Sequence, residues 1–133
     1  MTNYVNLTPH EITLKNGESH YDSATHHWVV DKLYEGPFME AVLPSEGVAS
    51  VKRYNEEVAD PNFLEGDFTV PHYKVSFGEI EGLPEPVEGV IYIVSSLVFQ
   101  AATVIGRKDV ACVDRVIYGE GHKVLFAMAL SVA

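Results

Sequence analysis

Only one stretch of this 133-residue chain has the spacing of an α-helix, and turn-forming residues cut the remainder into short pieces. Ten glycines and seven prolines are spread along the whole length, a distribution that favours many short elements. Aromatic residues, which make up 11% of the chain, are enriched in β-strands. We therefore expect a protein built mainly from strands, with one principal helix.

The helical stretch covers about residues 96–105. Ser95 or Ser96 can cap its first turn, because a serine hydroxyl accepts a hydrogen bond from a free backbone N–H group. Gly106 can end the helix in the left-handed conformation. The apolar side chains of the stretch recur at helical spacing and predict one buried stripe, formed by Leu97, Val98, Ala101, Ala102 and Ile105.

Period-2 alternation predicts strands over residues 48–54 and 73–77, each with one buried face. Residues 90–94 are apolar on both faces, which is typical of a central strand. Two further strands, roughly 111–118 and 122–131, are expected to pair as a C-terminal hairpin across a glycine-rich turn.

The N-terminal third is expected to begin with a strand that bends at Thr8–His10. The Asn16-Gly17 dipeptide suits a hairpin turn, with residues 28–30 as the returning strand. Residues 31–47 hold two Pro/Gly clusters and are expected to form a long loop, although a hairpin within residues 18–43 remains an alternative. The whole chain, residues 1–133, is thus predicted to be a single α+β domain with a mainly antiparallel sheet.

The formal net charge of −10 at pH 7 should repel DNA, RNA and anionic membranes, so no such partner is expected. The charge is uneven, because basic side chains outnumber acidic ones by one within residues 107–133. This segment predicts a local site for a small anion near the C-terminus. The alternative is that its charges only keep a hairpin soluble. The basic residues concerned are Arg107, Lys108, Arg115 and Lys123.

A single cysteine, Cys112, excludes an internal disulfide and fits a reducing cytoplasm. Its apolar neighbours predict a small buried side chain rather than a nucleophile. No charged N-terminal region precedes an apolar run, so no signal peptide is expected. No apolar stretch reaches the roughly 18 residues of a membrane-spanning helix.

Five short segments form a recognisable set, namely Asn6-Leu7-Thr8-Pro9-His10, Pro44 to Ala49, Phe77 to Pro86, Gly89 to Ser95 and Arg107-Lys108-Asp109. With them the chain resembles a family of small bacteriophage and prophage proteins of unknown function. The resemblance covers most of the chain, but residues 18–43 are longer than the family pattern and the glycine-rich C-terminal end departs from it. It implies a viral accessory protein in the cytoplasm of a bacterial host. Proteins of that class often counter host immunity, some by sequestering cyclic ADP-ribose variants or cyclic oligonucleotides.

The helix and its flanks supply the candidate ligand-binding residues. Ser95 and Ser96 would offer hydroxyls and backbone N–H groups to a phosphate. Arg107 would bind a phosphate or stack on a base, with Phe77 as an aromatic platform. Because the two helix ends lie roughly 15 Å apart, both would reach one ligand only between protomers. The full candidate set is Phe77, Ser95, Ser96, Arg107, Lys108, Asp109 and Arg115. The alternative makes Ser95 a plain cap, Phe77 a core residue and Arg107 a partner of Asp109.

Neither a nucleophile elbow nor a phosphate-binding glycine loop occurs in the sequence, so no catalytic residues are assigned and no enzyme is expected. His26 and His27 would point to opposite faces of a strand and could not chelate one ion, so neither a metal nor a cofactor is expected.

Three functions remain. The chain could sequester a nucleotide-derived signalling molecule without catalysis, inhibit or adapt a host protein, or serve as a small virion or assembly component. A homodimer or higher homo-oligomer is expected, because residues 90–94 and 124–130 are apolar on both faces and one helix covers only part of that surface.

Overall fold

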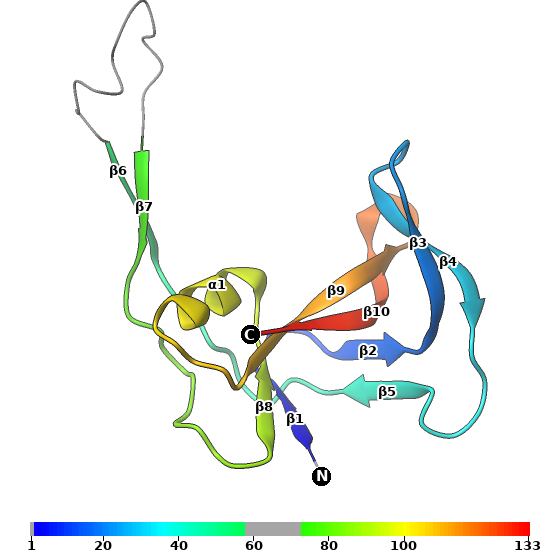
Figure 1. The fold of residues 1–133 in the computed structure, drawn as a ribbon, viewed down its shortest axis with the longest axis horizontal. Coiled ribbons are helices and arrows are strands. Elements are labelled where there is room, and N and C mark those ends of the chain that lie inside the picture. The colour runs from blue at the N-terminus through cyan, green and yellow to red at the C-terminus, as the bar shows by residue number, and fades with distance from the viewer. Residues whose placement is uncertain (1, 58–72) are drawn as a thin grey trace, which may run out of the picture.

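The computed structural model describes residues 2–57 and 73–133, which form ten strands, one α-helix and one short 3-10 turn (Figure 1). The elements in chain order are β1 (Asn3–Asn6), β2 (Ile12–Lys15), β3 (Gly17–Asp22), β4 (His27–Leu33), β5 (Glu40–Leu43), β6 (Arg53–Glu57), β7 (Tyr73–Phe77), β8 (Val90–Ile93), α1 (Ser96–Val104), β9 (Val110–Tyr118), η2 (Glu120–His122) and β10 (Val124–Val132).

Six strands form one sheet in the order β1-β8-β9-β10-β2-β5. Three of its neighbouring pairs are parallel, namely β1–β8, β8–β9 and β10–β2, and only β9–β10 and β2–β5 are antiparallel. The α+β class is therefore right, but the expectation of a mainly antiparallel sheet is wrong for this sheet. The crossover through α1 makes β8 and β9 parallel. The other two parallel pairs, β1–β8 and β10–β2, join strands that are distant in sequence.

The helix and the strands around it follow the sequence pattern closely. The Oγ atom of Ser95 accepts from the backbone N–H of Val98 at 3.3 Å, and Gly106 has φ +83° beyond the helix end. The N–H groups of Gly106 and Arg107 donate to the carbonyls of Thr103 and Ala102, which is the Schellman arrangement. The helix is thus confirmed, except that Ile105 is 67% exposed rather than part of the buried stripe.

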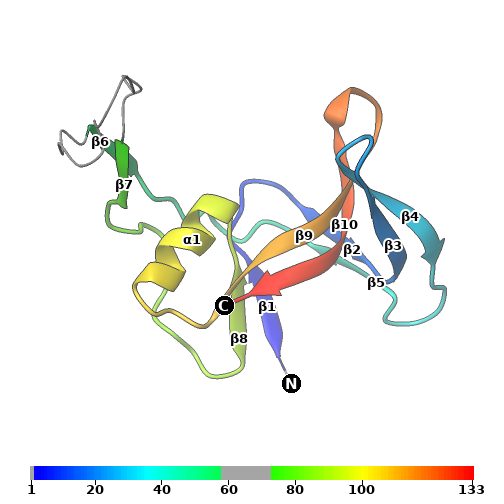
Figure 2. The same ribbon diagram turned by 45° about the horizontal axis from the view of Figure 1, so that its top comes forward.

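The core lies between α1 and one face of the sheet (Figure 2). β8 is central, between β1 and β9, as its two apolar faces predict. β9 and β10 pair as the expected antiparallel C-terminal hairpin. The buried apolar residues of this core are Leu7, Ala49, Tyr92, Val94, Val98, Ala102 and Val110.

Asn6 is the buried polar residue that ties the N-terminal loop to this core. Its Nδ2 donates to the carbonyls of His10 at 2.8 Å and Leu43 at 2.9 Å. Its Oδ1 accepts from the N–H of Thr8 at 2.9 Å and from the Thr8 hydroxyl at 2.6 Å. The segment Pro44 to Ala49 is attached to the same loop, because the Ser45 hydroxyl donates to the Thr8 carbonyl at 2.6 Å.

The N-terminal hairpin differs from the expectation. The hairpin turn predicted at Asn16-Gly17 is not formed. Asn16 connects β2, in the large sheet, to β3, in a separate sheet, and these two strands do not pair. The hairpin turn lies between β3 and β4, where the Asp22 carboxylate accepts from the Ala24 N–H and the Thr25 hydroxyl at 3.0 Å each. These hydrogen bonds lower the pKa of Asp22. Residues 31–47 are not one long loop, since they hold the end of β4 and all of β5.

The strand expected over residues 48–54 begins only at Arg53, as β6. The strand over residues 73–77 is present as β7 and pairs with β6. Neither has the buried face that its alternation predicted, because all of β6 and most of β7 are exposed. The hairpin projects from the rest of the described chain (Figures 1 and 2), so no other element covers either face there.

Candidate functional site

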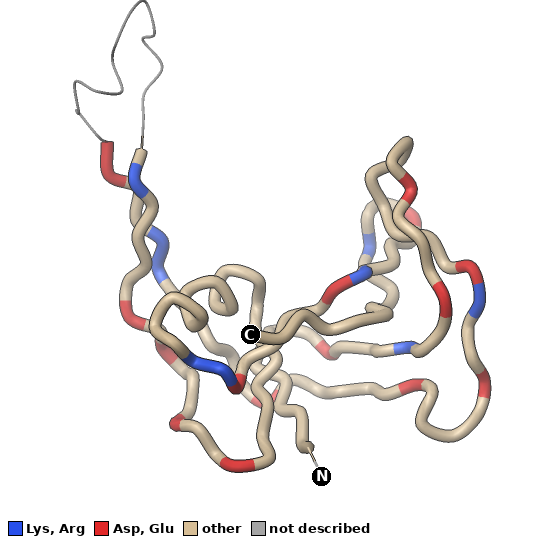
Figure 3. The backbone as a smooth tube through the Cα atoms, viewed as in Figure 1, with Lys and Arg blue, Asp and Glu red and all other residues tan. Residues whose placement is uncertain are grey.

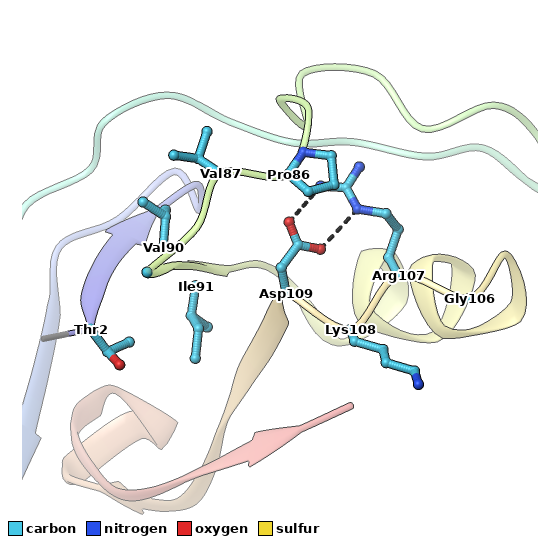
Figure 4. A pocket seen from close by; sticks show the side chains of 10 residues that line it. Thr2, Pro86, Val87, Val90, Ile91, Gly106, Arg107, Lys108 and Asp109 are labelled. Carbon is cyan, nitrogen blue, oxygen red and sulfur yellow. Dashed lines mark hydrogen bonds and ion pairs between the residues drawn. The ribbon is translucent and has the colours of Figure 1, made fainter.

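Arg107 is held within its own chain. Its Nε donates to Asp109 Oδ1 and its Nη2 to Asp109 Oδ2, both at 2.8 Å (Figure 4). Nη2 also donates to the Pro84 carbonyl at 2.8 Å, and the two side chains are only 18% and 16% exposed. These hydrogen bonds lower the pKa of the Asp109 carboxyl and raise the pKa of Arg107. The ion pair therefore fixes the Arg107 side chain just before β9, and the hydrogen bond to Pro84 fastens this segment to the one before β8.

The Asp109 carboxylate should make folding pH-dependent. Because its pKa is lowered in the folded state, the stabilisation is fully present above the unfolded value of 3.8 and is lost as pH falls through the folded value. We expect Asp109→Asn to cost about 1–2 kcal/mol at neutral pH, with a gap to the unmodified protein that closes in acid. Urea unfolding across the acid range measures this gap.

Arg107→Lys is the matched control for the ion pair, because it keeps the charge and loses the two-pronged geometry. We expect it to retain part of the stabilisation at neutral pH. A gap for Asp109→Asn that is the same size in acid as at neutral pH would contradict the role given to this carboxylate.

The pocket beside this ion pair has a volume of about 540 Å³ and lies between the β8 entry and the end of α1. Asp109 and Arg107 line it, and the Lys108 side chain points away from the ion pair (Figure 4). Two of the candidate cationic groups thus lie together here, but one of them is already neutralised.

Ser95 and Ser96 lie elsewhere. Ser95 caps α1, as described above, and Ser96 Oγ accepts from Gln100 Nε2 at 3.3 Å. Both line a mainly apolar cavity of about 630 Å³, which Cys112 and Lys123 also border. Cys112 is half-buried rather than fully buried as expected, and desolvation raises the pKa of its thiol, which disfavours the thiolate.

The remaining candidates, Phe77 and Arg115, are also apart. Phe77 ends β7 opposite Arg53, whereas Arg107 is engaged by Asp109 and Pro84. Arg115 lies on β9 with its guanidinium carbon 4.8 Å from the centre of the Trp28 ring. The structure therefore distributes the seven candidates over four places rather than one site.

Arg115 belongs to a cleft between the β3–β4 and β9–β10 hairpins. Two neighbouring hollows of about 540 and 300 Å³ share His27, Trp28 and Tyr118 as lining residues. We call this surface the aromatic cleft and define it by Tyr21, His27, Trp28, Arg115, Tyr118 and His122.

The rings of the aromatic cleft are packed against one another. The His27 ring lies 5.3 Å from Tyr118 and 5.7 Å from His122, measured between ring centres. Tyr21 meets Trp28 edge-on at 5.7 Å. Such an arrangement presents flat π-faces beside a guanidinium and imidazole nitrogens, groups that can hold a planar ring and an anionic substituent together.

Backbone strain gathers around the same cleft. Four non-glycine residues of the described chain have positive φ, and three of them are His26 at 58°, Arg115 at 49° and His122 at 58°. Each such residue costs of order 1–3 kcal/mol and persists where the surroundings enforce it. At Arg115 the N–H donates to the side chain of Asp114 at 2.7 Å, which supports the bend inside β9. From this residue the guanidinium extends over the Trp28 ring.

The Arg115 guanidinium has no carboxylate partner among the residues that the structure describes. Its neighbour Asp114 is engaged by the Ser131 hydroxyl at 2.8 Å and by the Arg115 N–H. Arg115 is thus the cation of the candidate set that remains available to a ligand while being held in position.

Sequence reasoning identified Arg115 but missed its surroundings. Trp28, Tyr118, His27 and His122 come from two hairpins that are about ninety residues apart, and only their tertiary packing joins them. A usable signal was the run His26-His27-Trp28, which places three ring side chains at one turn.

Over residues 2–57 and 73–133, no three His, Cys, Asp or Glu side chains converge as the ligands of a metal ion would. In that same part of the chain no helix is long and apolar enough to cross a membrane.

Comparison with known proteins leaves the cleft to be interpreted from its own residues. No protein-family model, no curated protein and no solved structure matches this chain.

Proposed function

We propose that this chain is a non-catalytic binding module that holds a small anionic molecule with a planar base in the aromatic cleft. The observation that carries the proposal is the placement of Arg115 over Trp28 on strained backbone, where it lines the smaller hollow of the aromatic cleft. Strained backbone clusters where ligands are bound, because pre-organised side chains lose less entropy on binding. The two hollows together are large enough for a nucleotide-sized ligand, since small-molecule pockets span about 300–1,000 Å³.

The biological setting of the proposal rests on the resemblance to phage and prophage proteins. A phage accessory protein that binds a nucleotide-derived signal would lower the concentration of that signal in the infected bacterium. Binding without turnover suffices for this role, which fits a cleft whose polar groups include no activated nucleophile among the described residues.

Calorimetric titration with cyclic nucleotides and ADP-ribose derivatives tests the ligand class. We expect Arg115→Ala and Trp28→Ala each to weaken binding about tenfold or more, because each removes a charge-assisted or stacking contact. Lys108→Ala is the matched control, since it removes a cation outside the cleft. Loss of binding in Lys108→Ala but not in Arg115→Ala would move the site to the pocket beside Arg107. No binding by the unmodified protein to any member of the panel would refute the proposed ligand class.

Replacing Arg115 with glycine separates the energetic cost of its strained backbone from the contribution of its guanidinium to ligand binding. Arg115→Gly and Arg115→Ala both lack the guanidinium, but only glycine accepts φ of 49° without a steric cost. We expect the glycine variant to be about 1 kcal/mol more stable than the alanine variant, while binding weakens about tenfold or more in both. Thermal unfolding of the two proteins measures the difference. Equal stability of the two variants would show that the backbone at residue 115 is not strained.

A further inference from the structure

The β6–β7 hairpin has a surface that residues 2–57 and 73–133, the described part of the chain, leave open. Its strands pair with each other and belong to neither of the other sheets. All of β6 is exposed, and β7 is exposed up to Phe77. Isolated two-stranded hairpins are at best marginally stable in water, so this one would gain stability from a further contact.

The two faces of the hairpin differ in character. Opposed residues of an antiparallel pair point to the same face, and the register places Arg53 with Phe77 and Glu57 with Tyr73. The three large apolar side chains of β7 thus share one face, where Tyr73 is 59% and Val75 is 42% exposed. We call this surface the hairpin face, and it consists of Arg53, Asn55, Glu57, Tyr73, Val75 and Phe77.

We propose that the hairpin face is the contact surface of a homodimer, in which two hairpins pack face to face with their strands antiparallel. A two-fold axis across the middle of the hairpin places Val75 against Val75 of the second copy. The same axis places Arg53 against Glu57 of the second copy, and Phe77 against Tyr73. At each end of the contact, the arginine of one copy then meets the glutamate of the other. The surface is therefore self-complementary, as an isologous interface requires.

Charge is the reason for choosing a second copy as the occupant. A chain with net charge −10 repels its own copies, so they approach best where the surface complements itself. Arg53 is the first residue of β6 and Glu57 is the last. Basic and acidic positions both occur along the hairpin (Figure 3). Neither Arg53 nor Glu57 has an ion pair within the part of the chain that the structure describes. On the opposite face Glu56 already faces Lys74 across the strands, so that face is internally matched.

The hairpin face is small. Its six residues per copy are far fewer than the roughly 20–30 residues a side of a standard interface, so we expect a dimer that dissociates in the micromolar range. The association is independent of the aromatic cleft, since no residue of the cleft takes part in it.

Sedimentation equilibrium of the full chain over a micromolar concentration series tests the proposal. We expect a monomer–dimer equilibrium whose Kd rises about tenfold in Arg53→Glu. The two-fold axis gives two Arg53–Glu57 contacts per dimer, so one charge reversal in the sequence disrupts both of them. Glu57→Arg should have the same effect. The double variant Arg53→Glu/Glu57→Arg exchanges the charges and should restore the Kd of the unmodified protein, a rescue that an unfolded hairpin would not give.

Lys74→Glu is the matched control, because it reverses a charge on the opposite face, and its Kd should be unchanged. Val75→Asp brings two carboxylates together on the axis and should leave only monomer. A protein that stays monomeric throughout the series would overturn the proposal. So would a dimer that is insensitive to Arg53→Glu, or a double variant that is no tighter than the single ones, because either places the contact elsewhere.

Discussion

Replacing Asn6 with alanine is expected to lower the free energy of unfolding by about 3 kcal/mol, because it leaves buried polar groups without partners. Asn6 is 0% exposed and makes four hydrogen bonds through both ends of its amide. Two of these hold the carbonyls of His10, in the loop before β2, and of Leu43, the last residue of β5. Urea unfolding followed by tryptophan fluorescence measures the loss.

Two further variants sharpen the role of this amide. Asn6→Asp keeps the size but turns the donor that faces two carbonyls into an acceptor, so it should be at least as destabilising as alanine at neutral pH. Below about pH 4 a protonated carboxyl regains one donor, and the deficit should shrink. Asn3→Ala on the exposed part of β1 is the control and should change stability by less than about 0.5 kcal/mol. A loss at Asn6 no larger than at Asn3 would contradict this account.

The parts of the fold that could be predicted from the sequence are those fixed by neighbouring residues. Ser95, the apolar stripe and Gly106 specify α1 within about a dozen residues, so local pattern was sufficient. The β9–β10 hairpin is equally local, since its turn and both strands lie within residues 110–132. β8 was predictable because a strand buried on both faces has apolar residues on both faces.

The predictions that were wrong concern segments whose structural partners are distant in sequence. Nothing in residues 3–6 tells that β1 pairs in parallel with β8, roughly ninety positions away. The alternation of residues 73–77 predicted a buried face, but the same pattern arises when a strand offers its apolar side to another molecule. The Asn16-Gly17 dipeptide has the composition of a hairpin turn, yet the chain uses Gly17 for close packing against the Lys32 carbonyl.

The candidate site was predicted only in part, for a related reason. Several segments that carry the family resemblance contact one another in pairs, as the loop after Asn6 does with Ser45 and Pro84 does with Arg107. These contacts hold the scaffold together, so the segments that suggested the resemblance do not by themselves mark a binding site. Arg115 was identified by its charge alone, and the rings around it became evident only from the packing of β4 against β9.

Gly82 and Gly106 provide a matched pair that tests one of these scaffold contacts. Their φ angles are +80° and +83°, so alanine at either position has the same backbone cost of about 1–2 kcal/mol. The surroundings differ, because a Cβ at Gly106 meets nothing within 4 Å, whereas a Cβ at Gly82 lies 2.4 Å from the Val48 carbonyl oxygen. Alanine at Gly82 therefore has to displace the backbone of residue 48 as well.

We expect Gly106→Ala to lose only the backbone term and Gly82→Ala to lose about 3–4 kcal/mol, since steric overpacking adds typically 1–3 kcal/mol. The displaced backbone adjoins the bridge in which Ser50 and Glu81 exchange two hydrogen bonds of 2.8 Å, so the loss should include this contact. Amide hydrogen exchange at residues 50 and 81 should accelerate in Gly82→Ala and stay unchanged in Gly106→Ala. Equal losses of stability in the two variants would show that left-handed backbone alone, and not the close approach to Val48, requires glycine at position 82.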